Sequence, residues 1–498
     1  MTKTIQEINE KIRKGDARVV TAEEMIQIVE AKGAHVAAEE VDVVTTGTFG
    51  AMCSSGAFLN FGHSDPPIKM ETLTLNGVEA YHGNAAVDCY IGVTKMHPER
   101  PFEYGGGHVI EDLVAGKTVE VEATAYGTDC YPRRRIETEI TIRDLNQAIL
   151  CNPRNAYQRY ATAVNGRSEV MYTYMGKLLP DYGNATYSGA GSLSPLCNDP
   201  DYETIGVGTR IFLGGGVGYV IGEGTQHDPS NRLGTLMVKG DLKQMKPEYL
   251  RGASFTKYGT SLYVGLGIPI PILTEKLAQK TAIRDEAIAS NVVDYGVPRR
   301  QRPILKQTNY AELKSGKVTV NGREIPVTAL SSLKTARAIA EELKRWIENG
   351  EFLLTQPVER LPTGGAFKPM KVSKETPYAQ AIMTPAVTCT PDEGVQEVAQ
   401  RIIRKAVNHI VVVNSDNQLI GIVTSFDVTK AIATGEKDLT KIMTHKVVTA
   451  TPDEPVELCV QKMKQHDISA LPVTDSRNKV LGIVTSEGVS RLLGGRAK

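Results

Sequence analysis

The chain has 498 residues, which is too long for one compact core and favours about two to four domains. Lysine plus arginine and aspartate plus glutamate both number 57, so the net charge of zero gives no global field for attracting nucleic acid or an anionic membrane. The charged N-terminus lacks the apolar core of a secretory signal, and no stretch has the roughly 20 apolar residues of a membrane span. We therefore expect a soluble, cytoplasmic protein that binds neither nucleic acid nor membrane.

The first elements that the sequence predicts are a helix and several strands. Thr21 and Glu24 have the spacing of a capping box ahead of an apolar run, and Gly33 supplies a stop signal. The alternating VDVVTTG from Val41 predicts a strand, and two further alternating segments do the same, at residues 117–127 and 136–145. The Gly, Tyr, Thr and short β-branched runs of this region predict a strand-rich α+β domain.

A helix is predicted over residues 335–350, because Ile339, Leu343 and Ile347 recur at helical spacing and Asn349-Gly350 ends the pattern. We expect this helix to close the first domain. The segment LPTGGAFKPMKVSKETPYAQ that follows has no hydrophobic periodicity and is typical of a linker. The sequence thus predicts a large domain over residues 1–365 and a linker over residues 366–380.

The remainder of the chain is an internal repeat. VTCTPDEGVQE from Val387 recurs 61 residues later as VTATPDEPVEL from Val448, and GIVTS recurs at the same offset from Gly421 to Gly482. Each copy continues from a TPDE turn through a helix and a strand to a polar turn and a GIVTS strand. The helix faces predicted to be buried are Val395, Val398, Ile402 and Ala406 in the first copy, and Val456, Val460 and Met463 in the second. Two units, residues 381–437 and 438–498, are expected to pack together.

This pair resembles tandem CBS domains, with repeats of the βαββα type. The resemblance implies adenosyl ligands between the repeats, with a Thr hydroxyl near the phosphate or sugar and an Asp carboxylate on the ribose hydroxyls. The first copy supplies Thr424 and Asp427, whereas the second supplies Thr485 but has Gly488 in place of the Asp. One ribose site is therefore expected. The alternative is a pair that only dimerises, with Asp427 as a helix cap.

The seven cysteines are an odd number, are widely scattered and form no C-x-x-C pair. Disulfides, a zinc ribbon and a ferredoxin-type cluster held by this chain alone are therefore not expected. Two cysteines are candidates for chemistry. Cys53 lies among Gly, Ala and Ser in GTFGAMCSSGAF, which suits either a reactive loop cysteine or a small buried hydrophobe.

Cys130 is the sharper candidate, because Arg133, Arg134 and Arg135 follow it closely. Guanidinium groups favour thiolate, the form that attacks or carries sulfur, and they can bind a substrate carboxylate through two hydrogen bonds. A basic surface turn at a strand end is the alternative. A weaker set, consisting of His63, His82, Asp88 and Cys89, is interpreted as structural. The glycine-rich residues 214–227 meet no nucleotide motif, and we interpret them as tight turns.

Together, TTGTFGAMCSSGAFLNFGHSDPPIKM, YHGNAAVDCYIG, YGTDCYPRR, GGGVGYVIGEGTQH and the CBS tail resemble the homocysteine-biosynthesis family, the L-aspartate semialdehyde sulfurtransferases. The resemblance implies that aspartate semialdehyde, a sulfide equivalent and two electrons yield homocysteine. It also implies a cysteine persulfide, for which Cys130 is the matching position and Cys53 the second cysteine of interest.

The same resemblance implies a small ferredoxin-like iron–sulfur partner as electron donor, since no flavin motif or cluster-ligand spacing is visible in the chain. No tightly bound cofactor is expected. S-adenosylmethionine, which lies downstream of homocysteine, or another adenosyl ligand such as ATP or AMP is expected at the CBS pair, and CBS pairing suggests a homodimer. Two rival hypotheses are a non-catalytic adenosyl sensor or scaffold and an enzyme like inosine monophosphate dehydrogenase, whose barrel would need regular βα alternation.

Overall fold

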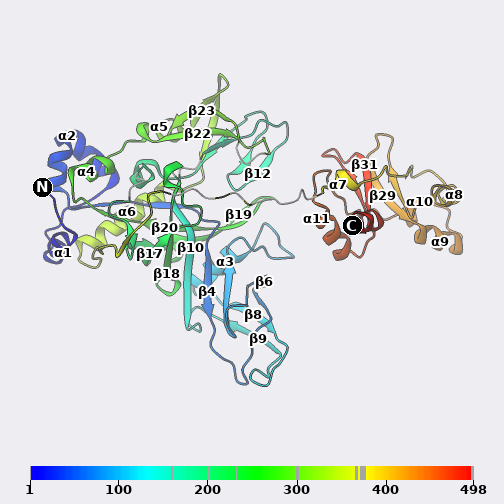
Figure 1. The fold of residues 1–498 in the computed structure, drawn as a ribbon, viewed down its shortest axis with the longest axis horizontal. Helices are drawn as coiled ribbons and strands as arrows, with labels where there is room; N and C mark the ends of the chain where they lie inside the picture. The colour runs from blue at the N-terminus through cyan, green and yellow to red at the C-terminus, as the bar shows by residue number, and fades with distance from the viewer. Residues whose placement is uncertain are drawn as a thin grey trace. The chain divides into compact units, whose positions relative to one another are not determined.

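The computed structural model describes residues 2–158, 161–198, 202–231, 233–298, 302–364, 368, 370 and 377–494. The chain separates into two units, Met1–Lys368 and Pro369–Lys498 (Figure 1). Most of the predicted linker over residues 366–380 lies outside the described residues. In the part of the chain that is described, no helix is long and apolar enough to cross a membrane.

A nine-stranded antiparallel sheet forms the centre of the first unit (Figure 1). Its order is β19 (Leu250–Phe255), β20 (Gly259–Gly267), β16 (Arg210–Leu213), β17 (Gly216–Glu223), β18 (Leu233–Asp241), β10 (Gln147–Gln158), β4 (Gly56–Asn60) and β7 (Asp88–Gly92), with β3 (Thr48–Ala51) also paired to β20. The strands run antiparallel, so the parallel barrel of the dehydrogenase hypothesis is wrong. Residues Gly214 and Gly215, with φ of 61° and 91°, make the tight turn between β16 and β17 that the sequence predicted.

Five smaller groups of strands complete the described part of the first unit. A six-stranded mixed sheet has the order β23 (Ile304–Asn309), β22 (Ala289–Asp294), β11 (Thr162–Val164), β14 (Ala185–Tyr187), β25 (Arg323–Ala329) and β24 (Lys317–Val320). A four-stranded sheet has the order β6 (Val78–Glu79), β5 (Thr72–Leu75), β8 (Val119–Thr124) and β9 (Arg135–Ile140). A third sheet joins β1 (Val19–Thr21), β2 (Val43–Thr45) and β21 (Pro269–Pro271), and two pairs join β12 (Met171–Thr173) to β13 (Gly176–Leu178) and β15 (Gly206–Val207) to β26 (Glu359–Arg360). The strands predicted in this unit are confirmed as β2, β8 and β9, and with them the α+β class.

The described helices of this unit are α1 (Ile5–Lys14), α2 (Ala22–Glu40), α3 (Gly106–Val114), α4 (Glu275–Thr281), α5 (Tyr310–Lys314) and α6 (Leu333–Glu348). Thr21 and Glu24 form the predicted capping box. The predicted helix stop at Gly33 is confirmed, because Gly33 has non-helical φ 83° and ψ 158°; a second helical segment then runs to Glu40 and buries Ala37 in the core. Helix α6 is confirmed, but β26 follows it within the same unit, so α6 does not close the domain.

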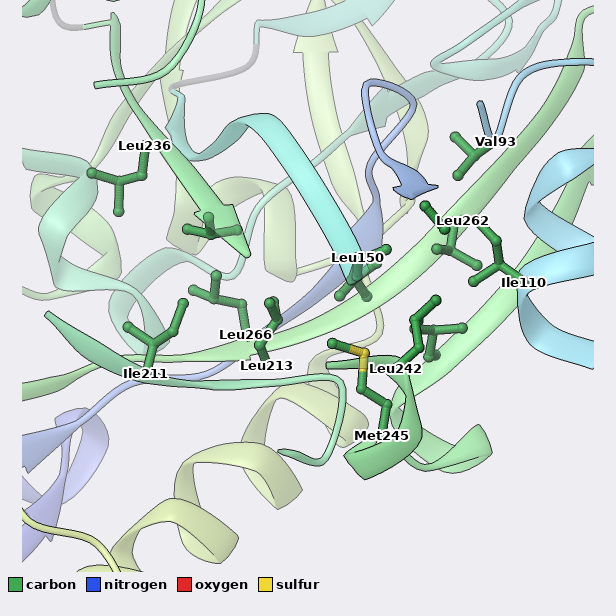
Figure 2. Close-up of a cluster of buried hydrophobic side chains, with 14 of the residues drawn as sticks. Val93, Ile110, Leu150, Ile211, Leu213, Leu236, Leu242, Met245, Leu262 and Leu266 are labelled. Carbon is green, nitrogen blue, oxygen red and sulfur yellow. The ribbon is translucent and has the colours of Figure 1, made fainter. Parts of the chain in front are cut away.

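The main hydrophobic core lies against the nine-stranded sheet. Figure 2 shows side chains from four of its strands and from α3 meeting there, among them Leu150, Leu213, Leu236, Leu262 and Ile110. Each of these five is fully buried. Because burial of apolar side chains is the main favourable term in folding, this cluster fixes the strands whose ends carry the site described below.

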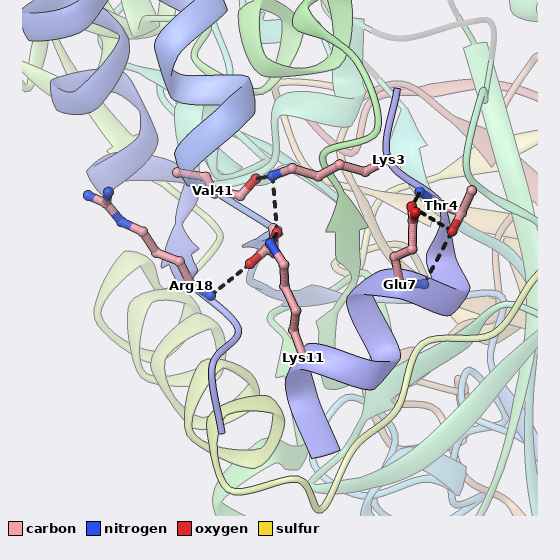
Figure 3. A network of polar contacts seen from close by, with 7 residues as sticks. Lys3, Thr4, Glu7, Lys11, Arg18 and Val41 are labelled. Atoms are coloured by element: carbon pink, nitrogen blue, oxygen red, sulfur yellow. Dashed lines mark hydrogen bonds and ion pairs between the residues drawn. The ribbon is translucent and has the colours of Figure 1, made fainter. Parts of the chain in front are cut away.

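A buried carboxylate ties the N-terminal segment to the rest of the first unit (Figure 3). Asp42, with 2% of its side chain exposed, lies 3.0 Å from the ammonium of Lys3 and 2.8 Å from that of Lys11, and it accepts a hydrogen bond from the Arg18 N–H. Burial raises the pKa of the Asp42 carboxyl, but the bonds from Lys11, Arg18 and Lys3 outweigh it and hold the pKa below its ordinary value.

Asp42→Asn is expected to lower the free energy of unfolding of the first unit by about 3 kcal/mol at pH 7, because two lysines lose a buried partner. Since the folded pKa is depressed, the stabilisation is present above the unfolded value of about 4 and is lost as pH falls through the folded value. The difference between wild type and variant should therefore shrink in acid. Urea unfolding followed by fluorescence of Trp346, the one tryptophan, measures it, and a difference independent of pH would contradict this account.

The second unit consists of two similar halves. The first contains α7 (Ala379–Ile382), β27 (Thr388–Cys389), α8 (Val395–Lys405), β28 (His409–Val413), β29 (Leu419–Thr424) and α9 (Ser425–Thr434). The second contains α10 (Leu439–Ile442), α11 (Val456–Gln465), β30 (Ala470–Thr474), β31 (Val480–Thr485) and α12 (Ser486–Gly494). The lead segments cross over: Thr384 bridges to Ile483 of the second half, and Thr444 bridges to Ile422 of the first. A shared cluster between the halves includes Val411, Val413, Leu419, Ala470, Val480 and Ile483, so the two repeats pack as predicted.

Two positions of the predicted helix faces are wrong. Ala406 is exposed, because it is the left-handed cap that ends α8 rather than part of its buried face. Val460 is 40% exposed, and its neighbour Cys459 occupies the core of the second repeat instead. A three- or four-residue spacing from Val456 allows both positions, and packing selects Cys459.

Candidate functional site

Cys53 lies in a tight turn between β3 and β4. The Met52 N–H donates to the Leu262 carbonyl on β20, and the Ser55 N–H donates back to the Met52 carbonyl, so the turn is closed on both sides. This bond continues the pairing of β3 with β20, in which Ala51 lies opposite Tyr263. The turn therefore holds the half-buried Cys53 thiol against the central sheet.

The sulfur of Cys53 has a specific partner on the neighbouring strand. The fully buried Ser261 of β20 donates its hydroxyl to the Cys53 sulfur at 3.2 Å. This hydrogen bond holds the sulfur against β20 and fixes its position in the turn. The geometry is that of a positioned thiol rather than a cysteine that merely fills space in a core.

Arg154, on β10, lines the same pocket as Cys53. The pairing of β10 with β18 shifts register between Asn152 and Asn155, and this bulge carries Arg154. The Arg154 N–H donates to the Asn152 side-chain oxygen at 2.9 Å. Bulges re-aim side chains beside functional sites, and here the irregular strand contributes a guanidinium to the pocket of Cys53.

These residues line a cavity of about 420 Å³. Its walls come from both large sheets: the β3–β4 turn and the β10 bulge on one side, and residues after β14 and before α6 on the other, including Ser188, Gly189 and Ser331. The Gly189 N–H donates to the Ser331 hydroxyl at 3.0 Å, which fixes that wall. A concave site with a thiol, a guanidinium and several hydroxyls is able to hold a small polar substrate.

Tyr258, in the turn between β19 and β20, also lines the cavity. Burial raises its pKa first, and the negative charge of Cys53 and then of Tyr174 raises it further. The Tyr258 phenol therefore stays protonated near neutral pH, where it is able to donate a proton to an oxygen that gains negative charge.

Cys130 lies in a different setting. It is exposed in the loop between β8 and β9, in a turn closed by reciprocal backbone hydrogen bonds between Thr128 and Tyr131. The ring of His63 stacks on Tyr131 with centroids 5.9 Å apart. The described lining of the Cys53 cavity does not include Cys130. An exposed thiol on a hairpin loop is open to a donor from solution.

The three arginines after Cys130 have unequal surroundings. Arg133 donates to the backbone carbonyls of Pro66 at 2.9 Å and Asp65 at 2.5 Å, which ties its loop to the segment after β4. Arg135 pairs with Glu137. Arg134 is exposed. The binding of a substrate carboxylate by these residues stays a prediction, for which Arg134 has the most freedom.

The weaker candidates from the sequence, such as Cys89 and His82, have different surroundings in the structure. Cys89 is fully buried, and burial, then Asp88, raises the pKa of its thiol to about 12, so it is not a nucleophile at neutral pH. Nδ1 of His82 is buried and has no hydrogen-bond partner among the described residues, so the interpretation of His82 as a satisfied histidine is wrong for that atom. Six cysteines are described as free: Cys53, Cys89, Cys130, Cys151, Cys389 and Cys459. Among the described residues, no group of His, Cys, Asp and Glu could hold a metal ion.

In the second unit, the predicted ligand residues lie at helix starts. Thr424 caps α9, and its N–H and hydroxyl both donate to one oxygen of Asp427, at 2.8 and 2.6 Å. The equivalent Thr485 accepts from the Gly488 N–H at 3.1 Å. Asp427 thus serves as a capping-box residue in this structure, and its other carboxylate oxygen has no hydrogen bond to a described residue.

A positioned thiol in a polar cavity, joined in one chain to a pair of similar repeats, is the arrangement of an enzyme with an appended repeat module. The profile of the family described as "Homocysteine biosynthesis enzyme, sulfur-incorporation" matches residues 17–354, and that of the CBS domain matches residues 379–434 and 437–495. The chain belongs to this homocysteine biosynthesis family. The hypothesis of a non-catalytic sensor or scaffold loses its support.

Two curated relatives are similar over their whole length. L-aspartate semialdehyde sulfurtransferase of Methanosarcina acetivorans is 54% identical over 496 residues, covering 99% of both chains. The enzyme of the same name from Methanocaldococcus jannaschii is 55% identical over 509 residues, again covering 99% of both. Among solved structures, a CBS domain pair in complex with 5′-methylthioadenosine and S-adenosyl-L-methionine is 39% identical, covering 24% of this chain and 98% of that one, with a TM-score of 0.24.

The residues that sequence reasoning missed are Arg154, Ser261 and Tyr258. Each lies far from Cys53 along the chain and reaches it only through strand pairing or a bulge. The tetrad Asn152-Pro153-Arg154-Asn155, inside an otherwise regular strand, is the one local signal that could have drawn attention to Arg154.

Proposed function

We propose that this enzyme converts L-aspartate semialdehyde, a sulfide equivalent and two electrons into L-homocysteine, and that the aldehyde reacts in the Cys53 cavity. The observation that carries the proposal is the positioned Cys53 thiol, which meets Ser261, Arg154 and Tyr258 in one cavity. Full-length similarity to enzymes named for this reaction supports the same substrate.

The two cysteines have different tasks in this proposal. Cys130, exposed beside Arg134, takes up sulfane sulfur as a persulfide. The Cys53 thiolate attacks the outer sulfur, so that one neutral sulfur atom moves to Cys53 and Cys130 leaves as a thiolate. Each step breaks one sulfur–sulfur bond and forms another, so electrons balance without an outside oxidant.

The persulfide on Cys53 then adds to the aldehyde carbon, and Tyr258 donates a proton to the oxygen as it becomes negative. Two electrons cleave the sulfur–sulfur bond and restore the Cys53 thiol, and loss of water leaves a thioaldehyde. Two further electrons give the thiol of homocysteine. When free sulfide is the source, its sulfur is first oxidised by two electrons to the sulfane level, and an oxidised iron–sulfur protein accepts that electron pair, so that the net demand is two electrons. We propose a ferredoxin-like iron–sulfur protein as the electron donor.

The direct test is anaerobic formation of homocysteine from aspartate semialdehyde and sulfide, with a low-potential reductant or a ferredoxin-like protein supplied. Product that requires all three components is the expected result. Its absence under every combination of donor and reductant would refute the proposed reaction.

We further propose that the CBS pair binds S-adenosylmethionine as a signal of downstream product, in a homodimer. Asp427→Asn is expected to weaken binding about tenfold or more, because a carboxylate that accepts from ribose hydroxyls becomes an amide. Isothermal titration measures it, with Asp416→Asn on the exposed β28–β29 turn as the matched control. Equal affinity of wild type and Asp427→Asn would contradict the proposed ribose site.

A further inference from the structure

The Cys53 cavity has an unbalanced charge. Of the described residues that line it, Arg154 is the one arginine, and no lysine, aspartate or glutamate accompanies it. The Arg154 guanidinium makes no ion pair or side-chain hydrogen bond with any residue that the structure describes, whereas the half-buried Arg401 pairs with Glu393. Because no described protein group occupies its donors, this guanidinium is available to an anionic ligand in the cavity.

The position of Arg154 is coupled to that of the thiol by a single buried amide. Asn152 is 1% exposed, and its Nδ2 donates to the Ser55 hydroxyl at 2.8 Å. Its Oδ1 accepts from the Arg154 N–H at 2.9 Å and from the Ser54 hydroxyl at 3.4 Å. One side chain thus joins the bulge that carries the guanidinium to the turn that carries the sulfur.

We propose that Arg154 binds the carboxylate of the substrate in the Cys53 cavity and thereby places the reactive carbon next to the sulfur. The proposal rests on the proposed function only in naming that cavity as the site of reaction. The ligand class is a small carboxylate, because a planar guanidinium presents two parallel donors that match the two oxygens of such a group. It differs from the prediction that Arg133, Arg134 and Arg135 do this, and one experiment separates the two.

The experiment compares the rates at which iodoacetate and iodoacetamide alkylate Cys53 in the full chain, read by peptide mass spectrometry so that Cys130 is scored separately. Both reagents are similar in size and attack the same thiolate, but only iodoacetate carries a carboxylate. Arg154→Met is expected to lower the ratio of the iodoacetate to the iodoacetamide rate by about tenfold, the loss of one charge-assisted interaction. Arg154→Lys, which keeps the charge without the paired donors, should be intermediate.

Arg323→Met, on the exposed β24–β25 hairpin, is the matched control and should leave the ratio unchanged. An unchanged ratio in Arg154→Met would overturn the proposal, as would an equal fall in both rates, which would mean that the thiol itself was disturbed. A reduced ratio in Arg134→Met together with a normal one in Arg154→Met would move the carboxylate site to the Cys130 loop. This readout needs no turnover, so it stands even if homocysteine formation fails.

Where turnover is measured, Arg154→Met should raise the KM for aspartate semialdehyde by about tenfold or more while formation of persulfide on Cys130 stays normal. An unchanged KM would contradict the assignment. A chain that makes no homocysteine yet shows the altered alkylation ratio would refute the proposed reaction and leave the carboxylate site intact.

Discussion

Cys53→Ala is expected to lower the rate of homocysteine formation by about three orders of magnitude or more, because it removes the thiol that the cavity surrounds. Loss of the nucleophile cannot be offset by the remaining hydroxyls, whose pKa values lie far above that of a thiol. The measurement is the initial rate of anaerobic product formation at saturating sulfide and reductant.

Cys151→Ala is the matched control, since Cys151 is a buried cysteine of the same sheet whose thiol has its pKa raised by burial. It should keep activity within a few-fold of wild type. Substantial turnover by Cys53→Ala would show that the Cys53 cavity is not where the sulfur is transferred, and the Cys130 loop would then be the place to look.

Gly107→Ala should have the largest effect among glycine substitutions that act on the site without touching substrate. A Cβ at this position of α3 would lie 2.1 Å from the backbone oxygen of Ser261, whose side chain donates to Cys53. Since neither backbone gives way easily, α3 must move off β20, at a cost of about 3 kcal/mol. We expect a lower urea midpoint by Trp346 fluorescence and slower alkylation of Cys53.

Gly222→Ala on β17 is its control, because nothing lies within 4 Å of the added Cβ. Its urea midpoint should stay close to that of wild type, and the alkylation rate of Cys53 should not change. Wild-type stability in Gly107→Ala would mean that the close approach of α3 to β20 is not maintained in solution.

Much of the fold follows from patterns that are local in sequence. The alternation in β8 and β9, the capping box at Thr21 and the period of α6 are decided by neighbouring residues, so they were predicted well. The stop at Gly33 was predicted too, but the second helical segment after it was not, because the burial of Ala37 depends on distant parts of the chain. The order of the nine-stranded sheet depends on pairings between distant strands, which no local pattern contains.

The residues of the candidate site likewise fall into those that local sequence identifies and those that only the structure identifies. Cys53 and Cys130 could be selected from their local surroundings, since small residues around one and arginines beside the other suit a reactive thiol. The structure adds a difference that the sequence could not show, namely a cavity at Cys53 and an open loop at Cys130. Arg154 and Ser261 reach Cys53 through a bulge and a strand pairing, so they become visible only in three dimensions.

The most direct test follows the persulfide itself in Cys53→Ala. The variant is loaded with polysulfide, a sulfane-sulfur donor, under anaerobic conditions and mixed with aspartate semialdehyde, and its cysteines are alkylated and mapped by mass spectrometry over time. Persulfide on Cys130 that forms normally and then persists in the presence of the aldehyde is the predicted result, because transfer to the substrate needs Cys53. Consumption of the Cys130 persulfide by the aldehyde at the wild-type rate would contradict the central claim.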